Sequence, residues 1–115
     1  MATRTPITIF LGTLTTVASA SSYTVPAGAL LTISAATFNN TTAAGVTVQV
    51  DVTPPGGSAL PLVGGATDLN IPASGAAPTT VPGLVGQTLA AGGKIEMSAS
   101  ANTSINAWLS GYLQQ

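Results

Sequence analysis

The segment Val46-Thr47-Val48-Gln49-Val50-Asp51-Val52-Thr53 decides the fold class of this 115-residue chain. Four valines alternate in it with four polar residues, and side chains of a β-strand point to opposite faces with this period of two. Valine also favours the extended conformation, because its branched side chain packs well on a pleated surface. The segment is therefore predicted to be a strand with one buried face and one face in water, as in antiparallel sheets.

The same alternation, less regular, extends in both directions from this segment. It predicts further strands at residues 5–11, 13–17, 22–25, 30–38, 67–71, 78–81, 94–100 and 104–113. Turns rich in proline and glycine separate these segments, and no long stretch shows clean helical periodicity. We therefore expect an all-β fold: an antiparallel, jelly-roll-like β-sandwich with seven to nine short strands and no substantial helix.

Three of the predicted strands are expected to gather their apolar side chains on one face. In residues 5–11 this face holds Ile7, Ile9 and Leu11, and in residues 30–38 it holds Leu31, Ile33 and Ala35. In residues 104–113 the expected core face is made by Ile105, Ala107, Leu109, Gly111 and Leu113, and the opposite face by Asn106, Trp108, Ser110 and Tyr112. Two aromatic side chains are thus predicted to share the face that is not aliphatic.

Charged residues are scarce, and histidine and cysteine are absent. The five formal charges are Arg4, Asp51, Asp68, Lys94 and Glu96, only 4% of the chain, against roughly 25% in an average domain. Without His and Cys there can be no zinc, haem or iron–sulfur site built on these ligands, no thiol chemistry, no His-based triad and no disulfide. Two cations cannot form a basic patch, so no nucleic-acid partner is expected.

The remaining polar groups do not form a recognisable site. The three carboxylates have no spacing that would pair them across a cleft or gather them around a hard cation. The glycine-rich turns lack the lysine of a phosphate-binding loop. We therefore expect no enzymatic activity, no cofactor, no metal and no small-molecule substrate. The apolar runs are shorter than the roughly 18 residues of a membrane-spanning helix, so no membrane partner is expected either.

The length fits a single domain. Residues 22–115 are predicted to form the β-sandwich, and residues 1–21 an N-terminal arm or edge strands that could pair with a neighbour's sheet. Residues 1–20 are also similar to a secretory signal. A secreted surface protein cleaved after Ala20 therefore stays an alternative.

The scarcity of charge predicts a surface that other subunits cover, because interface cores are depleted in Lys, Glu and Asp. A net charge of −1 also does little to keep molecules apart. We expect a symmetric assembly and, by analogy with sandwich domains in shells, a homotrimer. The candidate interface residues are Arg4, Ile7, Ile9, Phe10, Trp108 and Tyr112. For Trp108, packing at the edge of the core and stacking on a sugar are the alternatives.

Several short motifs occur in an order that resembles a known group of proteins. They are Ser22-Tyr23-Thr24-Val25-Pro26-Ala27-Gly28, Asn39-Asn40-Thr41-Thr42, Val46-Thr47-Val48-Gln49-Val50, residues 89–100 and Leu109-Ser110-Gly111-Tyr112. Across residues 22–112 this order is similar to that of small β-sandwich virion proteins of tailed bacteriophages, which include capsid decoration (cement) proteins and minor head or tail proteins. Many of them have an acidic residue in the last turn, where this chain has Gly93 followed by Lys94.

The resemblance implies a structural virion protein without catalytic residues, a decoration protein that stabilises a tailed-phage head through subunit contacts. Its partners would be further copies of itself, as a homotrimer, and the major capsid protein. Its location would be the outer surface of the phage head, after assembly in the bacterial host cytoplasm. The alternatives are a tail, baseplate or fibre-associated subunit and a carbohydrate-binding β-sandwich module.

Overall fold

The computed structural model describes residues 3–63, 69–71, 79–80 and 84–115. Over these residues it contains ten strands and one turn of 3-10 helix. The elements are β1 (Arg4–Thr13), η1 (Ala18–Ala20), β2 (Ser22–Thr24), β3 (Leu30–Asn40), β4 (Val46–Thr53), β5 (Leu60–Val63), β6 (Leu69–Ile71), β7 (Thr79–Thr80), β8 (Thr88–Ala90), β9 (Lys94–Ala99) and β10 (Ile105–Gln114). The predicted all-β class is confirmed.

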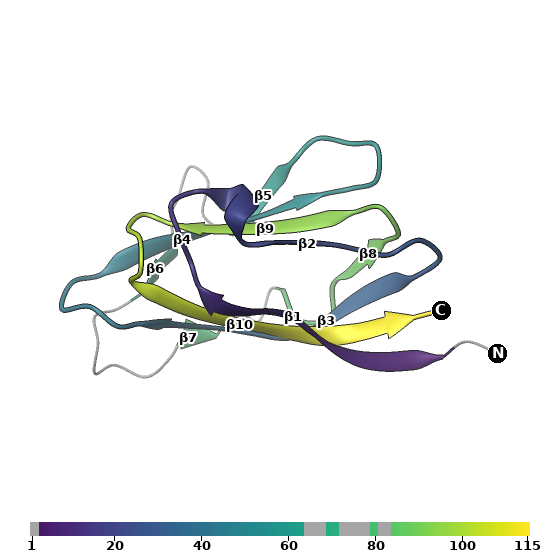
Figure 1. Ribbon diagram of the computed structural model, residues 1–115, viewed down its shortest axis with the longest axis horizontal. Coiled ribbons are helices and arrows are strands. Elements are labelled where there is room, and N and C mark those ends of the chain that lie inside the picture. Colours follow the sequence, from purple (N-terminus) through teal and green to yellow (C-terminus); the bar gives the residue numbers. More distant parts are fainter. Residues whose placement is uncertain (1–2, 64–68, 72–78, 81–83) are drawn as a thin grey trace.

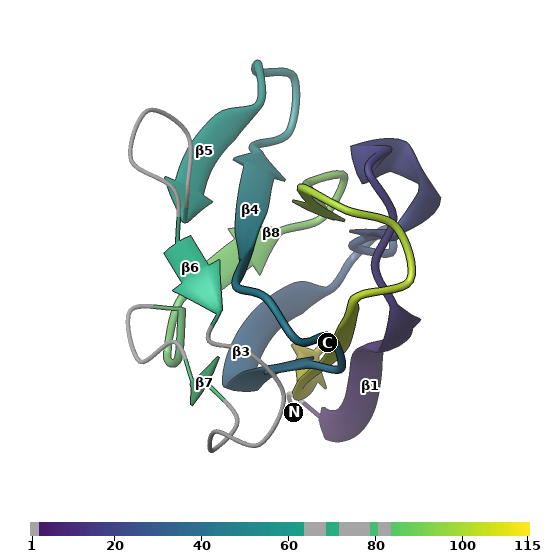
Figure 2. The same cartoon turned by 90° about the vertical axis from the view of Figure 1, so that its left-hand side faces the viewer.

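The strands form two antiparallel sheets that lie one above the other (Figure 1). Sheet A has the order β1-β10-β3-β7, with β8 also paired to β3, and sheet B has the order β2-β9-β4-β5, with β6 also paired to β4. Figure 2 shows the two layers end-on, with β3 and β1 on one side of the core and β4 and β5 on the other. The arrangement fits the β-sandwich predicted from the sequence.

The core fills the space between the two sheets. From β4 it receives Val46, Val48 and Val50, each at most 6% exposed, so the alternation that predicted this strand is confirmed. From sheet A the largest fully buried side chains are Phe38, Leu31, Ile105 and Leu109. Both inner faces are apolar because every second residue of the long strands is apolar.

A bulge in β1 changes which residues lie on the apolar face predicted for this strand. The register against β10 shifts between Thr8 and Phe10, and a bulge of this kind adds one residue and reverses the alternation beyond it. Ile9 is buried, Ile7 and Phe10 pack against the core, and Leu11 lies outside with 67% of its surface exposed. The expectation that Leu11 shares one face with Ile7 and Ile9 is therefore wrong.

A second irregularity lies where β3 pairs with β10. Ser110 pairs with Ala35, but the next residue, Gly111, pairs with Ile33. Leu31 and Ile33 are buried as expected, whereas Ala35 is exposed and Ala36 takes its place in the core. The prediction that Ala35 shares one face with Leu31 and Ile33 is wrong, because a register shift moves the alternation by one residue here as in β1.

The sequence also misplaced some short elements. The strand expected at residues 13–17 is wrong, because β1 ends at Thr13 and no strand follows until β2. The strands β5 and β8 were not expected, so the described residues form ten strands instead of the predicted seven to nine. Of the strands expected at residues 67–71 and 78–81, β6 and β7 are present, and the remaining positions lie outside the described residues.

Candidate interaction surface

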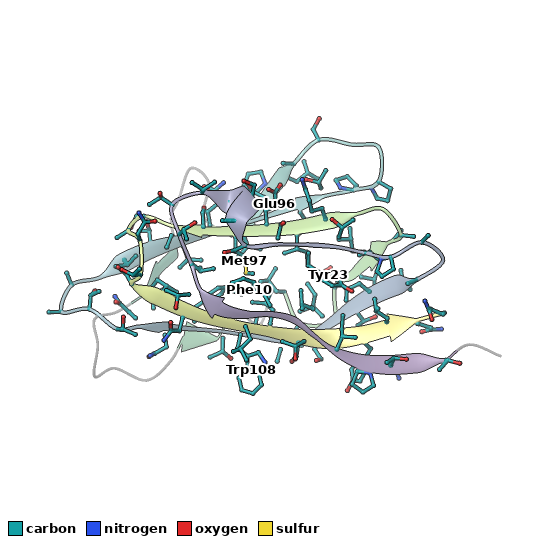
Figure 3. All side chains as sticks on the ribbon, viewed as in Figure 1. Phe10, Tyr23, Glu96, Met97 and Trp108 are labelled. Atoms are coloured by element: carbon teal, nitrogen blue, oxygen red, sulfur yellow. The ribbon has the colours of Figure 1, made fainter. Side chains whose placement is uncertain are left out.

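The outer face of sheet A is centred on β10, which has neighbours on both sides. The predicted division of this strand is confirmed: Ile105, Ala107, Leu109 and Gly111 are buried, while Asn106, Trp108, Ser110 and Tyr112 point outward. Figure 3 shows Trp108 projecting away from sheet B, whereas Phe10, Met97 and Tyr23 lie between the sheets. Trp108 is 56% exposed and lies outside the core of this chain.

Pairing of β10 with β1 and β3 arranges the outer side chains in rows across the sheet. One row is Leu11–Trp108–Thr37, and the next along the strands is Thr8–Ser110–Ala35. Residues directly opposite on paired strands share a face, with their Cβ atoms about 5 Å apart. Leu11 and Trp108 make the first row bulky, whereas the second row holds only small side chains. We call the first row the ridge and the second row the groove.

The two ends of this face are held by polar contacts. At one end the guanidinium carbon of Arg4 lies 5.0 Å from the centroid of the Tyr112 ring, within the range of a cation–π interaction. At the other end the Thr13 hydroxyl donates a 2.7 Å hydrogen bond to the side-chain oxygen of Asn106. Arg4 is the only charged residue in the described strands of sheet A.

The structure thus separates the six residues proposed as an interface. Arg4, Trp108 and Tyr112 come together on the outer face of sheet A. The other three, Ile7, Ile9 and Phe10, lie on its inner side. Leu11 joins the outer face instead, which the sequence did not indicate because the bulge before it is set by pairing with β10.

The outer face of sheet B carries three of the five charges. Lys94 Nζ lies 3.3 Å from Glu96 Oε1. Asp51 lies directly opposite Glu96 in the register of β4 and β9, and its Oδ1 accepts a 2.8 Å hydrogen bond from the Gln49 side-chain amide. Asp68, the fifth charge, lies outside the described residues. Among the described residues the two outer faces therefore differ in chemistry: the face of sheet B carries three charges, and that of sheet A holds Arg4 alone.

A hollow of about 240 Å³ opens on sheet B beside these charges. It is lined by Thr47, Val48, Gln49, Ser98, Ala99 and Ser100. The Ser100 hydroxyl accepts a hydrogen bond of 3.1 Å from the Thr47 backbone amide, so it is already engaged within the sheet. The lining offers hydroxyl and amide groups but no charged group. Among the described residues, no three acidic side chains gather into a possible metal site.

No helix in the described part of the chain has the length and hydropathy needed to cross a membrane.

Taken together, the fold and its surface define an all-β protein of the two-sheet sandwich class with one nearly uncharged outer face. No protein-family model matches the chain, and no curated protein matches it. Among solved structures it is similar to a chain in the structure of the infectious bursal disease virus Gx strain, with 15% identity and a TM-score of 0.40. That match covers 99% of this chain and 29% of the other.

Proposed function

We propose that this chain is a structural subunit of a virion, and specifically a capsid decoration protein on the outer surface of a tailed-phage head. The observation that supports the proposal is the outer face of sheet A. There Leu11 and Trp108 stand side by side, 67% and 56% exposed. Exposed apolar residues that form a contiguous patch mark interaction sites more often than isolated ones do.

The physical role would be to add neutral contacts between neighbouring shell subunits. Each 100 Å² of apolar surface removed from water contributes about 2.5 kcal/mol before the costs of association. Many copies on one shell would sum such contributions against the pressure of packaged DNA. Because Arg4 is the only charge in the described strands of sheet A, we expect the attachment to depend little on salt.

The proposed partners are the major capsid protein and further copies of this chain. A homotrimer at three-fold positions of the shell is the arrangement proposed by analogy with other sandwich domains. Assembly would take place in the cytoplasm of the bacterial host. The resemblance of residues 22–112 to small virion proteins supports this placement.

The proposal is tested on particles that carry the protein and on matched particles from which it has been removed. We expect the stripped shell to remain assembled but to release its DNA at a lower temperature and to lose resistance to chelators. Rebinding the purified chain should restore both properties. Equal resistance with and without the chain would overturn the cement role.

Copy number distinguishes the head from the tail. A decoration protein should be present in amounts comparable to the major capsid protein, and quantitative gel analysis or a particle reconstruction measures this ratio. A few copies confined to one vertex would instead identify a tail, baseplate or fibre-associated subunit.

A second candidate function is supported by the exposure of Trp108 beside the hydroxyl groups of Thr37 and Ser110. An exposed aromatic ring among hydrogen-bonding groups is suited to stacking on a sugar. A glycan array tests this module directly. Binding that is lost in Trp108→Ala would favour it, and binding that is absent or unchanged would remove Trp108 as a sugar site.

A further inference from the structure

We propose that the outer face of sheet A pairs with the same face of a second copy across a two-fold axis, while the free edge of β1 is closed to strand addition. The proposal rests on the proposed function and deepens it, since it names the surface through which copies of this chain associate; a two-fold dimer here takes the place of the homotrimer that was proposed by analogy alone. It rests on the hydrogen-bond direction along β1, the shape of the two side-chain rows, the distribution of charge and the size of the face.

Strand addition is disfavoured by the backbone of β1 itself. Thr3 and Gln115 exchange two hydrogen bonds of 2.8 and 3.0 Å, so the alternation of an antiparallel pair directs the amides of Thr5 and Ile7 toward β10. The backbone groups at Arg4, Pro6 and Thr8 then face the free edge. Proline has no N–H to donate, and the bulge follows two residues later. Natural sheets use both features to block pairing at an edge.

The face, in contrast, is complementary to itself. The large row Leu11–Trp108–Thr37 lies next to the small row Thr8–Ser110–Ala35. A two-fold axis parallel to these rows and midway between them places the ridge of each copy over the groove of the other. Such an isologous contact needs only one surface, used twice. The strands of the two copies then run antiparallel.

Charge favours this pairing and disfavours the alternative face. The axis places the two Arg4 side chains at opposite ends of the interface, each near the neutral Thr13 and Asn106 end of the other copy. Pairing through sheet B would instead bring two sets of Asp51 and Glu96 together, and these acids already lie opposite each other within one chain. Because bringing these like charges together is costly, sheet A is the more favourable face for pairing.

The face is also large enough. The strands β1, β10 and β3 have 10, 10 and 11 residues. At about 3.3 Å per residue and about 4.8 Å between strands, with side chains at the margins, they offer about 500 Å² per copy. Two such faces bury about 1,000 Å², the size from which a specific interface is expected.

The experiment measures the mass of the full-length chain against concentration by sedimentation equilibrium. We expect a reversible dimer of twice the 11.2 kDa chain mass. Thr37→Lys places two lysines near the axis beside Trp108 and should weaken dimerisation by at least about tenfold. The matched control is Thr47→Lys, which adds the same charge on the outer face of sheet B, at a residue that is also partly buried. This variant should leave the dissociation constant of the dimer unchanged. Circular dichroism verifies that both variants are folded.

A monomer at all concentrations, a mass of three chains, or equal weakening by the two lysine variants would each overturn the pairing. These outcomes are distinct from those of the particle experiment. A dimer that does not stabilise particles would overturn the decoration role alone, and a monomer that does stabilise them would overturn the pairing alone.

Discussion

Asp51 on β4 and Glu96 on β9 lie directly opposite each other on the outer face of sheet B. Like charges in this position are destabilising. Lys94, 3.3 Å from Glu96, and the Gln49 amide, 2.8 Å from Asp51, offset part of that cost. Three of the five charges therefore lie in one small cluster, whereas Arg4 is the only charge in the described strands of sheet A.

Neutralising one member of this pair should stabilise the fold. Asp51→Asn removes the repulsion and keeps an oxygen that can accept the hydrogen bond from Gln49. We expect a gain of a few tenths of a kcal/mol, up to about 1 kcal/mol, in the free energy of unfolding at pH 7 and low salt. Urea unfolding with and without added salt measures it, and the gain should shrink as salt screens the pair. A loss of stability in Asp51→Asn would show that the acids do not repel.

The partial burial of Tyr23 leads us to expect a loss of stability at alkaline pH. Burial raises the pKa of its phenol above the usual value, because the charged form is poorly solvated between the sheets. The unfolded chain then loses this proton first, at a pH of about 10. The contribution to stability is complete below that pH and is lost as the pH rises toward the pKa of the folded state.

Thermal unfolding measured from pH 8 to pH 11 checks the direction of this pH dependence. Tyr23→Phe keeps the ring but cannot ionise, so its melting temperature should fall less steeply with pH than that of the natural chain. Parallel profiles for the two proteins would contradict the prediction.

Gly111 on β10 leaves no room for a side chain beside the backbone of β3. A Cβ added at this position would overlap the carbonyl oxygen of Thr32 and lie 3.1 Å from the Ile9 side chain. We expect Gly111→Ala to reduce the free energy of unfolding by about 1–3 kcal/mol or more. The matched control is Gly12→Ala on β1, where the nearest atom is the flexible tip of Phe10 at 3.3 Å. Equal effects in chemical denaturation would contradict this account of Gly111.

Pro6 is predicted to protect the free edge of β1. Pro6→Thr restores an N–H on that edge, so the variant should form larger, concentration-dependent aggregates, detected by light scattering, at concentrations where the natural chain forms none. Arg4→Thr serves as the control, since it changes a neighbouring edge residue without adding a backbone donor. If Pro6→Thr scatters no more light than Arg4→Thr, the edge is not blocked by proline.

The regular strands could be predicted from the sequence, and the bulged ones only in part. In β4 and β10 one residue in two is apolar throughout the buried stretch, so local pattern and tertiary pairing agree. Leu11 and Ala35 were misplaced because a bulge shifts the face by one residue, and its position depends on a partner strand far away in sequence. Likewise β5 and β8 are short edge segments whose strand state comes from pairing with β4 and β3.

The candidate surface was predicted to a similar extent. Alternation placed Trp108 and Tyr112 on one face, and the structure brings Arg4 beside Tyr112 on that face. The sequence contains no signal that separates Arg4 from Ile7, Ile9 and Phe10, because the division depends on the register between β1 and β10. The segregation of charge between the two sheets is also a property of the fold, since Asp51 and Glu96 are 45 positions apart in the chain.

The fluorescence of Trp108 reports whether the outer face of sheet A becomes covered, because Trp108 is the only tryptophan in the chain and is 56% exposed on that face. Acrylamide quenching is measured on dilute protein, on concentrated protein and on protein bound to particles. The account predicts strong quenching in the dilute sample, with weaker quenching and a blue-shifted emission once the chains associate. Quenching and emission that stay the same from the dilute chain to the assembled state would contradict it.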